Sequence, residues 1–235
     1  MGRSLWRRNC RAPSSGYSTV TNAGAGGSSA MSKEIAKILV ETGAVLFNTE
    51  EPFTYASGIR SPIYTDCRIL ISKPDERKII SKSLQDEILR GEYPDIICGT
   101  AAAGIPWAAW ISESLNKPMI FVRKKAKEHG RKKQVEGVLD EGARVQVVED
   151  LVSTGGSCLD AVEVVRQNGG VVSDVVAIFS YGLSDSLKNF EDAGLRLNSL
   201  TTLDEVLEYC LSKNVLDESQ AGEVRKWRGS PGGWK

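Results

Sequence analysis

The chain is poor in the residues that build metal centres and disulfide frameworks. Among its 235 residues there is one histidine, His129, and it lies in a run of charged residues. We therefore expect no multi-histidine metal site and no histidine-paired catalytic triad. The cysteines are odd in number and lack C-x-x-C spacing, which is typical of free thiols in a reducing compartment. They are Cys10, Cys67, Cys98, Cys158 and Cys210.

Charge and hydropathy exclude further classes of protein. The 30 basic and 30 acidic residues cancel, so the formal net charge is zero and no bulk attraction to nucleic acid is expected. No apolar run approaches the length that a membrane span needs. The chain is long enough for one domain with a substantial core and an appendage.

The first thirty residues differ from the rest in composition. They contain no acid, many Ser, Gly and Ala, and four arginines at positions 3, 7, 8 and 11. This is typical of an organelle transit peptide. A non-native leader fits equally well, because Met31-Ser32-Lys33 resembles a natural start. We expect a disordered leader over 1–30 and a folded domain over 31–235, in the cytoplasm, or in an organelle if the leader is a genuine transit peptide.

From Ser32 onward, helical and strand patterns alternate. Ser32 is expected to cap a helix that ends at Gly43, and Pro74 to open one that ends at Gly91. Strands separated by helices predict a parallel sheet with right-handed crossovers. The expected later elements are strands 95–99, 118–122, 144–148 and 174–180 and a helix over 156–168, followed by a helix, a short strand and two terminal helices.

The most informative stretch is 145–157, Val-Gln-Val-Val-Glu-Asp-Leu-Val-Ser-Thr-Gly-Gly-Ser. A strand is expected to end at Glu149 and Asp150, and a turn rich in hydroxyls and glycine leads into a helix. The free N–H groups and positive end of that helix favour a phosphate. The two acids would repel a phosphate, so they suit sugar hydroxyls or a hydrated cation.

Together these features predict a loop for a ribose 5-phosphate. The stretch lacks the Gly-Lys-Ser/Thr ending of a Walker loop and the G-x-G-x-x-G of a dinucleotide fingerprint. The alternative is an ordinary turn between strand and helix. The acid pair and the hydroxyl run favour the phosphate loop.

Two more loops are expected at the same edge of the sheet, where ligands of open α/β folds bind. The first, Gly99-Thr-Ala-Ala-Ala-Gly104, has small side chains that would let its backbone approach a diphosphate. A tight packing turn is about as consistent with it.

The second of these loops, 123–134, is almost free of apolar residues and should be mobile when empty. A solvated surface loop is the common fate of such runs, and a surface position that of a lone histidine. However, a departing diphosphate needs nearby cations, so His129 in this basic loop is a candidate phosphate contact or proton donor.

The order of these blocks, with Phe53-Thr-Tyr-Ala-Ser-Gly-Ile-Arg-Ser-Pro-Ile-Tyr-Thr-Asp-Cys-Arg68 before them, closely resembles the orotate phosphoribosyltransferases. The resemblance runs from about Ser32 to the C-terminus. It includes Val122-Arg-Lys-Lys-Ala-Lys-Glu-His-Gly130, Val135-Glu-Gly137 and Ala177-Ile-Phe-Ser-Tyr-Gly182. The chain looks monofunctional, because it is too short for the decarboxylase domain fused to some relatives.

The resemblance implies a type I phosphoribosyltransferase fold, in which helices flank a central parallel sheet and a small hood subdomain covers it. It implies transfer of a phosphoribosyl group from phosphoribosyl diphosphate to orotate, with Mg²⁺, in UMP synthesis. It also implies a homodimer, no partner nucleic acid or membrane, and no direct protein ligand to the metal.

Site residues follow from the same resemblance. Lys127, His129 and Asp150 would be catalytic, and Ser153 would also touch orotate. Lys124 matches a residue that reaches the neighbouring subunit's site. The residues expected to contact phosphoribosyl diphosphate are Arg123, Lys124, Lys127, His129, Glu149, Asp150, Leu151, Val152, Ser153, Thr154, Gly155, Gly156 and Ser157.

The chain departs from the family where orotate is recognised. Many members have Lys in place of Ala56 and Ala103, and Arg near Tyr181. We therefore expect orotate to be held by backbone amides, by segment 53–64 and by Ser153. Two alternatives remain: a phosphoribosyltransferase for another base, against which segment 53–68 argues, and a phosphoribosyl diphosphate sensor without turnover, against which Lys127 and His129 argue.

Overall fold

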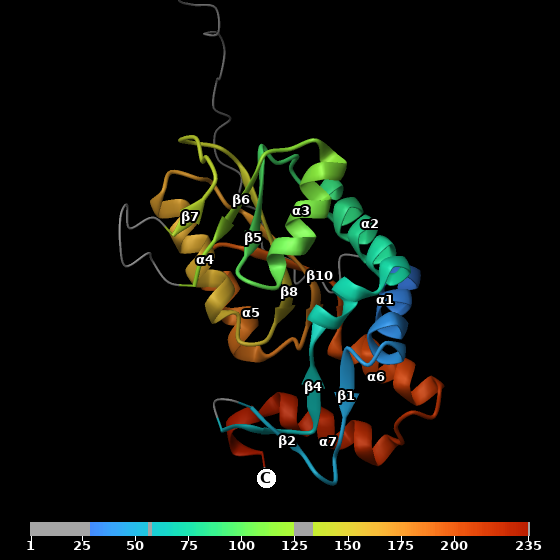
Figure 1. Cartoon of the computed structure of the whole chain (residues 1–235). Coiled ribbons are helices and arrows are strands. Elements are labelled where there is room, and N and C mark those ends of the chain that lie inside the picture. Colours follow the sequence, from blue (N-terminus) through green and yellow to red (C-terminus); the bar gives the residue numbers. More distant parts are fainter. Residues whose placement is uncertain (1–28, 56–57, 125–133, 235) are drawn as a thin grey trace, which may run out of the picture.

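A six-stranded sheet forms the centre of the computed structural model, which describes residues 29–55, 58–124 and 134–234 (Figure 1). The strand order is β10-β9-β8-β5-β6-β7, and every neighbouring pair is parallel except β6 with β7. The predicted parallel α/β sheet is confirmed. Its strands are β5 (Ile96–Thr100), β6 (Met119–Val122), β7 (Val135–Glu136), β8 (Val145–Val152), β9 (Asp174–Ser180) and β10 (Arg196–Thr202).

Helices cover both faces of this sheet. On one face lie α1 (Ser29–Glu41), α2 (Pro74–Arg90) and α3 (Gly104–Leu115), and on the other α4 (Gly156–Gln167) and α5 (Ser184–Asp192) (Figure 1). Each face has its own core, with Trp107 and Ile178 fully buried in the first and Val147 and Val175 in the second. Helix α6 (Leu203–Ser212) packs against α1.

Local sequence explains where α2 begins and ends. Pro74 occupies its first turn, together with the acidic Asp75 and Glu76, and Arg90 lies in its last turn. Proline is pre-organised for the first helical position. The acids at the N-terminus and the arginine at the C-terminus interact favourably with the helix dipole. The helix ends at Arg90, before Gly91, as predicted.

Helix α1 corrects one prediction. It begins at Ser29, so Ser32 lies inside it and is not its cap. The Ser32 side chain is fully buried and donates a hydrogen bond to Thr201 Oγ1 in β10 at 3.2 Å. Tertiary contact with the sheet therefore replaces the capping role. Of the expected leader, residues 1–28 lie outside the described part, and Ser29 and Ala30 are helical.

A small subdomain, which we call the hood, consists of strands β1 (Val45–Phe47), β2 (Phe53–Thr54), β3 (Arg60–Ser61) and β4 (Ile63–Thr65). β1 pairs with β4 and β2 with β3, both antiparallel. The carboxyl ends of the parallel strands point toward the hood (Figure 1). Helix α7 (Glu218–Gly229) lies beside the hood, and the short helix η1 (Cys67–Ser72) joins β4 to α2.

The structure can be compared with the expectations of free thiols and of no membrane span. Cys67, Cys98, Cys158 and Cys210 are free thiols, as predicted, and all four are buried. Cys10 lies outside the described residues. Within the described ranges, no helix combines the length and the apolar character needed to cross a bilayer.

Candidate active site

The acid pair lies on the part of β8 that pairs with one neighbouring strand and not with two. β8 pairs with β5 only as far as Val148, opposite Gly99, but continues beside β9 to Val152, opposite Ser180. The prediction that the strand ends at the acids was wrong, because pairing with β9 extends it. Glu149 and Asp150 therefore occupy the half-open end of a central strand, at the edge that faces the hood.

Burial sets the protonation of these acids. Glu149 is 7% exposed, and its Oε1 accepts a hydrogen bond from the backbone N–H of Asp150 at 3.0 Å. Burial, followed by the neighbouring charge of Asp150, raises the pKa of the Glu149 carboxyl to about 8. Burial also raises the pKa of Asp150, although the charge of Arg68 acts in the opposite direction. One proton is therefore held at this pair at neutral pH, and groups that donate hydrogen bonds to it would release that proton.

The turn after β8 leads into the N-terminus of α4. The first hydrogen bond of the helix runs from Leu159 N to Gly155 O at 2.9 Å. The N–H groups of the three preceding residues have no acceptor within the helix by its geometry. Gly156 and Ser157 are exposed, and the N-cap residue Gly155 offers no side-chain cap. This end of α4 can therefore receive an anion.

Gly155 is required by the shape of that turn. Its φ is +82°, in the left-handed region, and a Cβ there would lie 2.7 Å from Cε2 of Phe190 in α5. Leu151 and Val152 of the predicted site belong to the strand itself, and the Val152 side chain is 1% exposed in the core. Any contact of Val152 with a ligand would therefore come from its backbone, and its place in the site stays a prediction.

The loop after β5 is a packing turn. A Cβ on Gly104 would lie 2.4 Å from the carbonyl oxygen of Val148, and one on Gly99 would lie 2.8 Å from Cα of Ile105. Both glycines are thus explained by the close approach of β5, α3 and β8. The peptide bond between Ala101 and Ala102 is cis, and Ala101 N donates to Val122 O at 3.1 Å. The loop still lies at the same sheet edge as the acids.

Strands β6 and β7 form a stem for the expected catalytic loop. Arg123 N donates to Gln134 O at 3.0 Å, and Val122 pairs with Val135. The Arg123 guanidinium lies 3.4 Å from Glu136 Oε1, and Lys124 is exposed. Lys127, His129 and the predicted mobility of the loop fall within 125–133, outside the described residues.

Arg68 is a cation near the acid pair that sequence reasoning missed. Its Nε and Nη2 bind the two oxygens of Asp66 at 2.7 and 2.8 Å, and its side chain remains 64% exposed. Helix η1 packs against β8, which brings Arg68 close enough for its charge to act on Asp150. The Asp-x-Arg spacing in the sequence shows the pair, but not that it lies beside β8.

The departures from the family fall in different places. Tyr181 is 2% exposed, so it is a core residue. Ala103 occupies the N-cap position of α3, and Ala56 lies outside the described residues.

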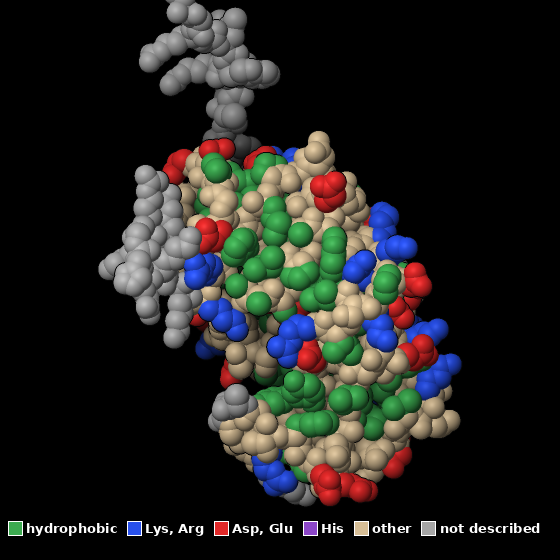
Figure 2. Space-filling model, in the orientation of Figure 1, with side chains coloured by type: hydrophobic (Ala, Val, Ile, Leu, Met, Phe, Trp, Pro, Cys, Tyr) green, Lys and Arg blue, Asp and Glu red, His purple; other side chains and the backbone are tan. Residues whose placement is uncertain are grey.

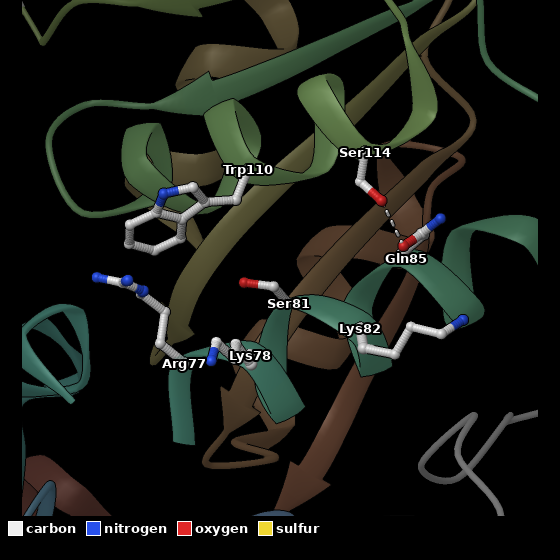
Figure 3. Close-up of a pocket in the computed structure, with 7 residues that line it drawn as sticks. All are labelled: Arg77, Lys78, Ser81, Lys82, Gln85, Trp110 and Ser114. Atoms are coloured by element: carbon white, nitrogen blue, oxygen red, sulfur yellow. Dashed lines mark hydrogen bonds between the residues drawn. The ribbon is translucent and has the colours of Figure 1, made fainter. Parts of the chain in front are cut away.

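Two surface hollows lie away from this edge. One, of about 310 Å³, lies between α2 and α3, where Arg77 stacks 4.7 Å from the Trp110 ring and Ser81 faces the space between them (Figure 3). The other, of about 490 Å³, lies beside β1 and the start of α7. Neither contains a predicted site residue. Within the described ranges, no cluster of three or more His, Cys, Asp or Glu side chains is placed to hold a metal ion by itself.

Comparison with known proteins agrees with this geometry. Residues 70–180 match the family described as phosphoribosyl transferase domain. The orotate phosphoribosyltransferase of Listeria innocua is 46% identical over 204 residues, covering 86% of this chain and 97% of that protein. The enzyme of the same name from Enterococcus faecalis is 43% identical and covers 87% and 98%.

Solved structures agree. Orotate phosphoribosyltransferase from Aeropyrum pernix superposes with a TM-score of 0.65 at 34% identity, over 74% of this chain and 96% of that one. UMP synthase of Leishmania donovani gives a TM-score of 0.71 at 30% identity over 84% of this chain, which spans 42% of that longer protein. The predicted type I phosphoribosyltransferase fold is confirmed, and the chain belongs to the orotate phosphoribosyltransferase family.

Proposed function

We propose that the protein transfers the 5-phosphoribosyl group of phosphoribosyl diphosphate to orotate, giving orotidine 5′-monophosphate and diphosphate. The strongest support is the acid pair at the half-open end of β8, directly followed by the uncapped N-terminus of α4. One site thus offers acceptors for ribose hydroxyls and donors for a phosphate. The relatives named for this reaction support orotate as the base.

The phosphate of the substrate would bind at residues 153–157. Its oxygens would accept hydrogen bonds from the free N–H groups of α4 and from the hydroxyls of Ser153, Thr154 and Ser157. The ribose hydroxyls would donate to Glu149 and Asp150. These donors favour the charged carboxylates, so substrate binding would lower the raised pKa of Glu149.

The diphosphate would lie toward the stem formed by β6 and β7. Arg123 and Lys124 occupy the start of the segment that also carries Lys127 and His129. Arg123, Lys127 and His129 would neutralise the charge that develops on the leaving diphosphate, and Lys124 would do so in the site of a second copy. The contacts of Lys127 and His129 stay predictions, because neither lies in the described part of the chain.

The chemistry requires no protein nucleophile. A ring nitrogen of orotate forms a bond to the anomeric carbon as the bond from that carbon to diphosphate oxygen breaks, and the electron pair leaves with diphosphate. The proton of that ring N–H is released to water or to the departing diphosphate. Positive charge then builds on the ribose ring, close to Glu149 and Asp150. Catalysis would come from positioning and from preorganised charge, which together supply large rate effects.

The acid pair also fits Mg²⁺. This ion is usually bound through one or two carboxylates, with water and substrate oxygens completing its shell. Glu149 and Asp150 would hold such an ion through its water shell, with no direct protein ligand, while the substrate supplies further oxygens. When bound, Mg²⁺ would neutralise negative charge on the diphosphate.

Orotate would bind between the turn after β8 and the hood. Ser153 is partly exposed at this edge, and segment 53–64 forms β2, β3 and the start of β4 on the opposite side. Position 103 carries Ala where many family members have Lys, and the Tyr181 side chain is buried in the core. Among the described residues, Arg68 is therefore a candidate cation for the carboxylate of the base.

We also propose a homodimer. Lys124 is exposed at the edge of the sheet, where it could reach a second copy. Hydrophobic side chains gather on the molecular face over α3 (Figure 2), where Ile105, Pro106 and Trp110 are only partly buried. Sedimentation velocity at several concentrations tests this: a species of twice the chain mass is expected, and a monomer throughout would contradict it.

Absorbance of orotate tests the reaction itself. Incubation with phosphoribosyl diphosphate and Mg²⁺ should deplete orotate and release one diphosphate per orotate consumed, and chelation of Mg²⁺ should stop both. Adenine and hypoxanthine serve as control bases and should not react. Turnover of a purine alone would mean a different base specificity. Tight binding of phosphoribosyl diphosphate without turnover of any base would indicate a sensor.

A further inference from the structure

Trp227 of the C-terminal helix α7 is buried against the hood. It is 1% exposed, and its ring makes edge contacts with Tyr55 of the hood and with Tyr181, which directly follows β9. The ring centroids lie 6.3 Å from Tyr55 and 5.4 Å from Tyr181. One side chain thus contacts both the hood and the residue that follows a core strand, and α7 lies beside the hood in Figure 1.

Hydrogen bonds make these contacts directional. Trp227 Nε1 donates to the carbonyl oxygen of Arg60 in β3 at 3.0 Å. The Tyr181 hydroxyl donates to Thr65 Oγ1 in β4 at 2.8 Å and lies 3.3 Å from the hydroxyl of Tyr55. Both strand pairs of the hood are therefore anchored, the β2–β3 pair at β3 by an indole and the β1–β4 pair at β4 by a phenol.

The same cluster is connected to the phosphate loop. Tyr181 N donates to the carbonyl oxygen of Val152 at 3.1 Å, and Val152 immediately precedes Ser153. A short path of direct contacts therefore runs from residues 153–157 through Tyr181 to Trp227 and β3. Its members are buried and hydrogen-bonded, so it fixes the distance between the phosphate loop and the hood.

We propose that Trp227 and Tyr181 are positioning residues that set the hood over the phosphate loop and thereby determine the affinity for the base. The inference rests on the proposed function. Neither side chain would touch the substrate, because both are almost fully buried. Their effect would appear in binding of the base and not in binding of the phosphoribosyl group, whose contacts lie on β8 and α4.

The test compares Trp227→Phe with Trp234→Phe. The first keeps an aromatic ring but removes the donor to Arg60. The second is a matched control from the same C-terminal segment, since Trp234 packs against the same core and its buried Nε1 has no partner among the described residues. Tyr181→Phe is the companion variant, because it removes the hydroxyl bonded to Thr65 and keeps the ring.

Two readouts separate positioning from general destabilisation. In steady-state kinetics, Trp227→Phe and Tyr181→Phe should raise KM for orotate by about tenfold, the scale of one lost hydrogen bond, and leave KM for phosphoribosyl diphosphate within about twofold. In calorimetry, both should weaken binding of orotidine 5′-monophosphate and leave that of ribose 5-phosphate unchanged. Trp234→Phe should match the wild type in all four measurements.

The outcomes are distinguishable. Equal weakening of orotidine 5′-monophosphate and ribose 5-phosphate would overturn the inference, since a structural role alone predicts that result. Unchanged KM values in Trp227→Phe and Tyr181→Phe would overturn it too. The proposed function would still stand in that case, provided that the wild-type protein turns over orotate. A wild-type protein that binds ribose 5-phosphate but neither orotate nor orotidine 5′-monophosphate would overturn both.

Discussion

The carboxyl group of Glu149 accepts a hydrogen bond from the backbone N–H of the residue beside it, Asp150, at 3.0 Å. The two acids are thus coupled through the chain as well as through space. Because β5 stops pairing with β8 after Gly99, their side of β8 is left without a neighbouring strand. An acid pair of which Glu149 is buried costs the empty protein stability at such an opening, and a ligand can restore that stability.

The first prediction concerns pH and stability. The pKa of Glu149 is raised from an ordinary 4.5 to about 8 in the folded protein. Its favourable contribution is complete below the ordinary pKa and is lost as the pH rises through the folded value. The free energy of unfolding should therefore fall between these limits, more steeply than in Glu149→Gln.

Urea titrations from pH 5 to pH 8.5 measure this slope. At the upper end Glu149→Gln should be more stable than the wild type, by an amount on the order of 1 kcal/mol, because it removes the need to bury a charge. Glu163→Gln, on the exposed side of α4, is the control and should follow the wild type. Parallel curves for wild type and Glu149→Gln would contradict the raised pKa.

The second prediction concerns the diphosphate contacts. Lys127→Ala should lower kcat by about 10²-fold or more, the scale of one lost charge contact in the transition state. The free energy of unfolding should change little. Lys133→Ala removes the same charge from the same segment outside the predicted site and is the control. Full turnover by Lys127→Ala would remove Lys127 from the catalytic groups.

The third prediction separates the charge of the acid pair from its shape. Asp150→Asn keeps the side-chain size but loses an acceptor for the ribose hydroxyls. We expect kcat/KM for phosphoribosyl diphosphate to fall by roughly 10²-fold, as for a misplaced reacting group. Asp160→Asn, exposed on α4, makes the same chemical change away from the site and should keep the wild-type value. Loss of activity in both variants would point to a general charge effect.

The fourth prediction tests the packing of the turn after β5. Gly104→Ala would place a methyl group 2.4 Å from the Val148 carbonyl oxygen, so the start of α3 must shift. We expect a loss of about 1–3 kcal/mol in the free energy of unfolding, typical of overpacking, seen as a lower Tm. Gly156→Ala has open space at its Cβ and should unfold near the wild-type temperature. Equal Tm values would mean that the turn yields at little cost.

Much of the fold could be predicted because periodic patterns and helix-end signals are local. Pro74 and Gly91 bracket α2 as expected, and β5, β6, β8 and β9 lie within a few residues of their predicted bounds. The two-residue β7 was not predicted, and β10 was expected only as a short strand without bounds. Ser32 was misplaced because its partner, Thr201, is remote in sequence. Capping preference cannot reveal such a tertiary contact.

The site was predictable in composition but less so in geometry. Glu149, Asp150 and the turn after them stand together in the chain, so one stretch of sequence identifies them. The extension of β8 depends on which strand lies beside it, and the packing role of Gly104 depends on Val148. In the sequence, Tyr181 marks a position where the chain differs from many family members. The structure shows that Tyr181 is a core residue, because its side chain is buried.

The stem of β6 and β7 has a further consequence for how the chain can vary. Arg123 and Gln134 are hydrogen-bonded at 3.0 Å, so the segment between them leaves and re-enters the sheet at one point. Its two ends are held by the stem, and doubling a loop's length costs only about 0.6 kcal/mol in closure entropy. The segment between Arg123 and Gln134 could therefore be replaced by the corresponding segment of a homologue, even one of different length, without shifting the register of the sheet.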